Sequence, residues 1–164
     1  MTLARLVLAA LLPLIVSGCA YMAPLQPAAT FYVMRHLNTP ESVPDPDLTP
    51  EGQRQAERLA NWFPGMEPPV TIFVSTTRRA QQTAAPLAAR LGITPKLYDP
   101  ADTPGLIAEA LKEPAPILIV GHSNTVPDVI EALGGARPGP LVHEDFGDVW
   151  TIRGGATSVQ KIGG

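Results

Sequence analysis

Residues 117–125 read Ile-Leu-Ile-Val-Gly-His-Ser-Asn-Thr, four large apolar residues followed by a glycine and then by polar residues. Three of the four are β-branched, and such a run is typical of a strand buried on both faces of a sheet. Phe31–Met34 and Val70–Val74 have the same apolar character. The pattern predicts a buried strand at each of these three places.

Amphipathic segments with helix signals lie between the apolar runs. Thr49-Pro50-Glu51 combines an N-cap hydroxyl, a proline at the first helical position and an acid in the first turn, which predicts a helix to about Phe63. A helix is also predicted over Arg79–Leu91, ended by Gly92, and Pro86 within it predicts a kink or a break. Further elements are expected as strands at Thr94–Tyr98, Val149–Ile152 and Ser158–Ile162 and as helices at Pro104–Lys112 and Thr125–Leu133.

Strands that alternate with helices predict an α/β protein, a three-layer α/β/α sandwich with a mainly parallel central sheet. At 164 residues the chain has room for one domain, and 45% hydrophobic content is enough for a real core. The net charge of −3 argues against nucleic acid as a partner.

The first residues have the character of a targeting segment. The mostly apolar stretch Leu6–Val16 follows one positive charge and is too short to span a bilayer, as expected for a signal peptide. Val16-Ser17-Gly18-Cys19 resembles a bacterial lipobox, in which the cysteine is lipidated and becomes the new N-terminus. Ala20 then favours the outer membrane, facing the periplasm; an ordinary cleaved signal and an uncleaved anchor are the alternatives. We therefore divide the chain into a signal peptide (1–18), a tether (19–30) and a single domain (31–164).

Cationic residues follow the three apolar strands. Arg35-His36 comes after the first strand, Arg78-Arg79 lies just beyond the second, and His122 follows the third. Because ligands of parallel α/β sheets bind beyond the carboxyl ends of the strands, these residues are expected to converge. Gathered positive charge is costly unless an anion neutralises it, and arginine matches phosphate oxygens. The pattern favours an anion site over independent structural roles. A zinc site at His36 and His122 lacks accompanying ligands, so we expect neither metal nor cofactor.

The motifs around these residues resemble those of the histidine phosphatase superfamily, in its phosphoglycerate mutase-like branch. They are Arg35-His36, the Ser-x-x-x-Arg-Ala-x-Gln-Thr-Ala run ending at Ala84, and Gly121–Pro127. The resemblance implies that His36 is a nucleophile that becomes phosphorylated, with one ring nitrogen held by a backbone carbonyl. It also implies that Arg35, Arg79 and His122 bind the phosphoryl oxygens, with Asn38 and Ser123 as further donors. Arg79, which matches the Arg-Ala of the motif, is preferred over Arg78.

Two features depart from the family pattern. Leu37 stands where relatives have a small residue, which predicts a narrower pocket entrance or a reshaped loop. The general acid expected some twenty residues after Arg-Ala is assigned to Asp102, with Asp99 and no acid as alternatives. A loop aspartate also suits a helix cap, and a missing acid would suit a good leaving group. His143 lies in an acidic loop where a surface role is expected.

The sequence thus predicts a metal-independent phosphatase of the envelope that hydrolyses phosphate monoesters through His36. Without a long inserted cap, its site is expected to be open to small or macromolecular phosphates. A non-catalytic anion-binding lipoprotein of the same fold is the main alternative. A mutase is a further one, which an address outside the cytoplasm disfavours.

Overall fold

The computed structural model describes residues 28–41, 44–63 and 66–163. The predicted signal peptide, Cys19 and the tether up to residue 27 lie outside these ranges. Within them, no helix combines the length and the apolar character needed to cross a bilayer.

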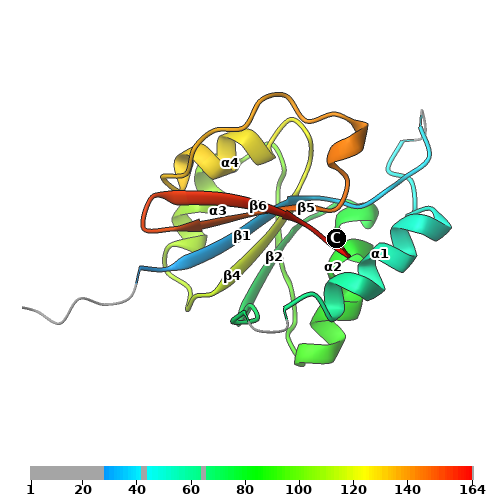
Figure 1. Cartoon of the computed structure of the whole chain (residues 1–164), viewed down its shortest axis with the longest axis horizontal. Coiled ribbons are helices and arrows are strands. Elements are labelled where there is room, and N and C mark those ends of the chain that lie inside the picture. The colour runs from blue at the N-terminus through cyan, green and yellow to red at the C-terminus, as the bar shows by residue number, and fades with distance from the viewer. Residues whose placement is uncertain (1–27, 42–43, 64–65, 164) are drawn as a thin grey trace, which may run out of the picture.

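Strands and helices alternate along the described chain, as the sequence predicts (Figure 1). In order they are β1 (Thr30–Arg35), α1 (Pro50–Ala60), β2 (Thr71–Ser75), α2 (Arg78–Leu91), β3 (Lys96–Tyr98), α3 (Thr103–Ala110), β4 (Ile117–Gly121), α4 (Val126–Ala132), a 3₁₀ turn η1 (His143–Asp145), β5 (Asp148–Arg153) and β6 (Ala156–Lys161).

The strands form one mixed sheet in the order β3-β2-β4-β1-β5-β6. The first four are parallel, and β5 and β6 are antiparallel additions at the β1 side. Gly154 and Gly155, with φ of 56° and 82°, make the tight turn between β5 and β6. The order places β1, β4 and β2 side by side in the centre, so the polar residues after these strands share one edge.

Helices cover both faces of the sheet, which confirms the three-layer architecture. One apolar core joins α1 and α2 to sheet residues such as Met34 and Val120. The other joins α3 and α4 to residues such as Val33 and Ile119. Figure 1 shows α3 and α4 together on one side of the sheet and α1 and α2 on the other. Neighbouring strand residues therefore face opposite cores, which explains why the central strands are apolar throughout.

The predicted helix boundaries are mostly confirmed. Thr49 caps α1 by accepting a hydrogen bond from the Gly52 amide at 3.1 Å, and Gly92 ends α2 in the left-handed region at φ 67°. Helix α1 ends at Ala60, slightly earlier than expected. The predicted break at Pro86 is wrong, because α2 runs continuously from 78 to 91. Its buried face, which includes Ala84 and Leu87, anchors the helix on both sides of the proline.

Candidate active site

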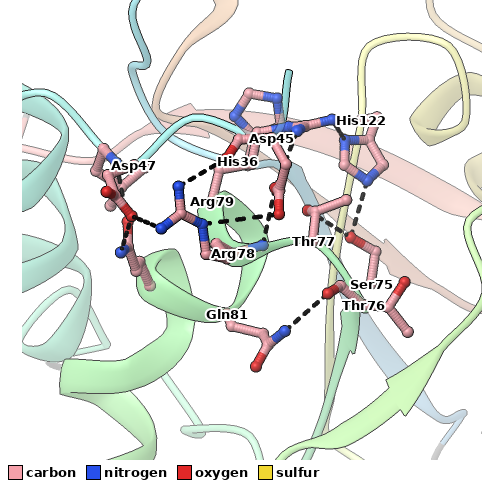
Figure 2. Close-up of polar contacts among 12 residues, drawn as sticks. His36, Asp45, Asp47, Ser75, Thr76, Thr77, Arg78, Arg79, Gln81 and His122 are labelled. Carbon is pink, nitrogen blue, oxygen red and sulfur yellow. Dashed lines mark hydrogen bonds and ion pairs between the residues drawn. The ribbon is translucent and has the colours of Figure 1, made fainter. Parts of the chain in front are cut away.

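The carboxyl ends of β1 and β4 bring His36 and His122 together. These strands pair in parallel with Arg35 opposite Gly121, and the His36 amide donates to the Gly121 carbonyl at 2.9 Å. The two imidazole centroids are 5.3 Å apart, and both side chains are buried. Arg79 at the start of α2 completes the cluster (Figure 2). The expected convergence of these segments on one edge of the sheet is what the structure shows.

His36 is held in one orientation by its own loop. Its Nδ1 lies 2.9 Å from the Leu37 carbonyl oxygen, a contact that assigns the hydrogen to Nδ1 and the lone pair to Nε2. Burial lowers the pKa of His36 to about 3, and the positive charges of nearby groups act in the same direction. The imidazole is therefore neutral at physiological pH, as a nitrogen nucleophile must be.

His122 is fixed by contacts on both ring nitrogens. Nη2 of Arg79 lies 3.3 Å from Nδ1, and Oγ of Ser75 lies 2.8 Å from Nε2. Since a guanidinium can only donate, Nδ1 is the acceptor and Nε2 carries the hydrogen that is donated to Ser75. Burial lowers the pKa of His122 to about 4, and Arg79 contributes to the shift. His122 is thus a neutral hydrogen-bond donor in the absence of a bound anion.

Arg79 is positioned by an acidic residue that the sequence analysis did not single out. Oδ1 of Asp45 lies 3.3 Å from Nη1 of Arg79 and accepts the Arg78 backbone amide at 2.9 Å, at the start of α2 (Figure 2). Asp45 adopts a left-handed backbone at φ 41°, which aspartate tolerates better than most residues. The Arg78 side chain is more exposed than that of Arg79 and pairs with Asp47 at 3.3 Å. Of the two arginines, Arg79 is the one that contacts His122.

Arg35, the last residue of β1, contacts the segment around η1. Its guanidinium carbon is 3.8 Å from the centroid of the Phe146 ring, and Nη1 donates to the Val142 carbonyl at 3.1 Å. Nε is buried and has no hydrogen-bond partner among the described residues. A buried guanidinium N–H without a partner is costly, and an anion at this edge of the sheet would satisfy it.

The Leu37 side chain does not narrow the entrance, so that expectation is corrected. The side chain is fully buried in the core beneath α1 and α2. The backbone of Leu37 contributes to the site instead. Its amide donates a hydrogen bond to Oγ1 of Thr83 at 2.9 Å. Thr83 in turn donates to the Arg79 carbonyl at 2.8 Å, which ties the nucleophile's loop to the helix that carries Arg79.

The two secondary donor candidates are placed differently. The Asn38 carbonyl accepts from the Thr49 amide at 2.9 Å, and its side-chain Oδ1 is buried without a partner among the described residues. Ser123 is half-buried in the turn between β4 and α4, next to His122. Both stay predictions as phosphate ligands.

Neither predicted acid is brought to His36. Asp102 is the N-cap of α3, where Oδ1 accepts the Gly105 amide at 2.9 Å. Oδ1 of Asp99 accepts the Ala101 amide at 2.9 Å. Both follow β3 at the far edge of the sheet, separated from β1 by β2 and β4. The geometry of Asp102 therefore supports the helix-capping role that was the alternative to a general acid.

Two further neighbours of the histidines were not predicted: Phe146, which comes from a distant segment, and Thr77, whose side chain lies within the second motif. Phe146 lies 5.8 Å from the His36 ring, and Thr77 extends the His122–Ser75 contact with its Oγ1 3.0 Å from Oγ of Ser75. Only the Asp-x-Asp run immediately before the predicted helix start was a signal for Asp45. Among the described residues, no group of three or more His, Cys, Asp or Glu side chains is placed to hold a metal ion.

Comparison with protein families agrees with this site. Residues 31–101, which contain His36 and Arg79, match the family described as histidine phosphatase superfamily (branch 1). Among curated proteins, PE-PGRS family protein PE_PGRS11 of Mycobacterium tuberculosis is 43% identical over 72 residues, which cover 39% of this chain. The match spans only 12% of that protein's length.

Solved structures share the fold at low sequence identity. The protein histidine phosphatase SixA, solved with tungstate, is 18% identical with a TM-score of 0.59, covering 80% of this chain and 94% of that one. A mycobacterial glucosyl-3-phosphoglycerate phosphatase is 15% identical with a TM-score of 0.58, covering 82% and 98%. Residues 31–101 are thus similar to the histidine phosphatase superfamily, and the chain as a whole shares the fold of these solved structures.

Proposed function

We propose that the protein is a phosphatase that transfers a phosphoryl group from its substrate to Nε2 of His36 and then to water. The observation that carries the proposal is the hydrogen bond between Nδ1 of His36 and the Leu37 carbonyl. It leaves a neutral Nε2 lone pair at an edge of the sheet where the guanidinium groups of Arg35 and Arg79 supply donors and His122 lies beside them.

The reaction has two balanced steps. The Nε2 lone pair attacks phosphorus while the bond from phosphorus to the leaving atom breaks, and the leaving group departs with that electron pair. Water then attacks the phosphohistidine, the P–N bond breaks, and inorganic phosphate leaves as His36 is restored. Arg35 and Arg79 donate to the phosphoryl oxygens in both steps and stabilise the charge on them. His122 becomes a further donor when the charge of the bound phosphate favours protonation of its Nδ1.

The placement of the carboxylates bears on the substrate. Asp99 and Asp102 are engaged in local turns beyond β3, and Asp45 is paired with Arg79. A site without a positioned acid favours leaving groups that need little protonation, such as activated monoesters, phosphoanhydrides or the imidazole of a phosphohistidine. One neighbour in fold bears the name protein histidine phosphatase, which makes phosphohistidine a substrate to test beside monoesters.

Turnover of p-nitrophenyl phosphate and of phosphohistidine by the soluble form starting at Ala20 tests this function. We expect activity that EDTA does not reduce and that His36→Ala removes. Ser158→Ala, at an exposed position of β6, is the control variant. Undiminished turnover in His36→Ala contradicts the mechanism. Binding of phosphate or vanadate without any turnover would instead favour the non-catalytic anion-binding alternative.

We also propose that lipidated Cys19 holds the domain at the outer membrane, on its periplasmic side. The tether would enter the domain at Thr30, the start of β1, whereas His36 follows the other end of that strand. Six strand residues place these ends about 17 Å apart, so the site would face away from the membrane. Release of the Cys19→Ser variant into the soluble fraction would support the anchor. Membrane retention of that variant would contradict it.

A further inference from the structure

A cavity of about 330 Å³ lies beside the proposed phosphoryl site. Its lining includes Arg35, Pro40, Glu41, Val142, His143 and Phe146. It therefore joins the loop after His36 to the loop around η1, two segments more than a hundred residues apart in the sequence. The contact between Nη1 of Arg35 and the Val142 carbonyl, at 3.1 Å, links these loops directly.

Phe146, which lines the cavity, is also a neighbour of the nucleophile. The Phe146 centroid lies 5.8 Å from the His36 ring and 5.2 Å from the His143 ring, which meets it edge to face. The Arg35 guanidinium lies over the Phe146 ring. Its Nε is buried and has no hydrogen-bond partner in the part of the chain that the structure describes. A substrate whose phosphoryl group reaches His36 and Arg35 would place its leaving group against Phe146 and His143.

The charges around the cavity change once a phosphoryl group is bound. Arg35 is then neutralised by the phosphate, whereas the Glu41 carboxylate remains on the lining. Asp145 adds a second negative charge, because its Oδ2 accepts the Val142 amide at 2.6 Å and its charge acts on Arg35. A leaving group with a carboxylate would be repelled, and a flat apolar or cationic group would be accommodated by the rings.

We propose that this cavity is the leaving-group subsite, and that it selects ring-bearing leaving groups that are neutral or cationic over anionic ones. The proposal rests on the phosphatase function proposed above and adds a substrate class to it. It also gives His143 a place beside the substrate, where the sequence favoured a surface role.

Three esters of one shape test the subsite: phosphotyramine, 4-ethylphenyl phosphate and the phosphate ester of 3-(4-hydroxyphenyl)propionic acid. Their para substituents differ in charge and are far enough from the phenolic oxygen to leave its acidity similar. We expect kcat/KM for the cationic and neutral esters to exceed that for the anionic ester about tenfold, as for charges a few ångströms apart near a protein surface. Equal values for all three esters would overturn the proposal.

Glu41→Gln separates the subsite from a general effect of the protein's net charge. In this variant the discrimination against the anionic ester should fall about threefold or more, since one nearby carboxylate is removed. Glu57→Gln, at an exposed position of α1, is the matched control and should leave the ratio unchanged. Equal ratios in wild type and Glu41→Gln, or an equal fall in Glu57→Gln, would overturn the assignment to this cavity.

A failure of catalysis can be told apart from a failure of the subsite. If none of the esters is hydrolysed, and neither p-nitrophenyl phosphate nor phosphohistidine is turned over, the proposed phosphatase function fails. The dissociation constants of the same three esters, measured by calorimetry, then decide the subsite. Tighter binding of the cationic and neutral esters, reduced in Glu41→Gln, would support it. Equal dissociation constants would refute it.

Discussion

Nη2 of Arg79 lies 3.3 Å from Nδ1 of His122, so the arginine sets the tautomer of the histidine as well as contributing charge. The hydrogen on the far nitrogen, Nε2, is then donated to Ser75 rather than exposed at the site. In this state Arg79 donates to His122, and an incoming anion has to compete for the Arg79 guanidinium. The predictions below follow from this arrangement and from the contacts that support it.

Ser75→Ala should loosen His122. Oγ of Ser75 is fully buried and is the partner of Nε2, so its removal leaves a buried N–H unpaired. We expect a loss of about 1 kcal/mol in the free energy of unfolding and a several-fold fall in kcat. Urea denaturation and steady-state kinetics measure the two effects. Ser158→Ala, at an exposed position of β6, is the control. If Ser75→Ala has the same stability and the same kcat as this control, Ser75 does not hold His122 in place.

Asp45→Asn should strengthen the binding of oxyanions. The amide can still accept from the Arg78 backbone, but the negative charge 3.3 Å from Nη1 of Arg79 is gone. We expect the inhibition constant for vanadate to fall about threefold or more. Asp47→Asn is the matched control, because Asp47 pairs with Arg78 and not with Arg79. Weaker or unchanged vanadate binding in Asp45→Asn would show that the carboxylate does not compete with the anion.

Acid should destabilise the fold through the two site histidines. Their pKa values in the folded protein, about 3 and about 4, lie below the value near 6.5 expected in the unfolded chain. As pH falls from 6.5 towards 4, the unfolded chain binds protons that the folded protein does not. The free energy of unfolding therefore decreases, by up to about 1.4 kcal/mol per pH unit for each histidine. Above pH 7 these groups add no pH dependence.

Urea denaturation at pH 7.5, 6 and 5 measures this slope. His36→Asn and His122→Asn should each flatten it, because each variant removes one group that titrates only in the unfolded chain. His143→Asn is the control. A slope that neither site variant changes would mean that the histidines titrate normally in the folded protein.

Gly52→Ala should destabilise the protein although alanine favours helices. A Cβ at this position would overlap the carbonyl oxygen of Asn38, two residues after His36. We expect a loss of about 2 kcal/mol in the free energy of unfolding, since backbone has to shift to make room. Gln53→Ala, at the next and exposed position of α1, should be close to neutral. Equal stability of the two variants would mean that the close approach is not a constraint.

The sequence was sufficient to predict the strands that carry the chemistry. Apolar runs that end in Arg35-His36, Ser75 and His122 are informative because parallel strands deliver their carboxyl ends to one edge. The sequence does not show which strands are neighbours. The structure pairs β1 with β4 in parallel, and both strands are central ones buried on two faces.

The remaining residues of the site could not be predicted because long loops bring them in. Asp45 reaches Arg79 from a loop more than thirty residues earlier, and Phe146 approaches His36 from a segment more than a hundred residues later. Spacing along the chain suggested Asp102 as the acid, whereas the structure shows it capping α3, after the edge strand β3. Local patterns predict elements and their ends well, whereas contacts between loops depend on the assembled sheet.

The most direct test of the phosphohistidine mechanism is to trap the phosphorylated enzyme. The protein is mixed with a substrate, quenched within milliseconds in alkaline detergent, where phosphohistidine is stable, and digested for mass spectrometry. We predict phosphate on the peptide that contains His36, absent in His36→Ala and still formed in Ser158→Ala. Turnover of the same substrate with no phosphate on His36 at any quench time, or with phosphate on another residue, would contradict the account.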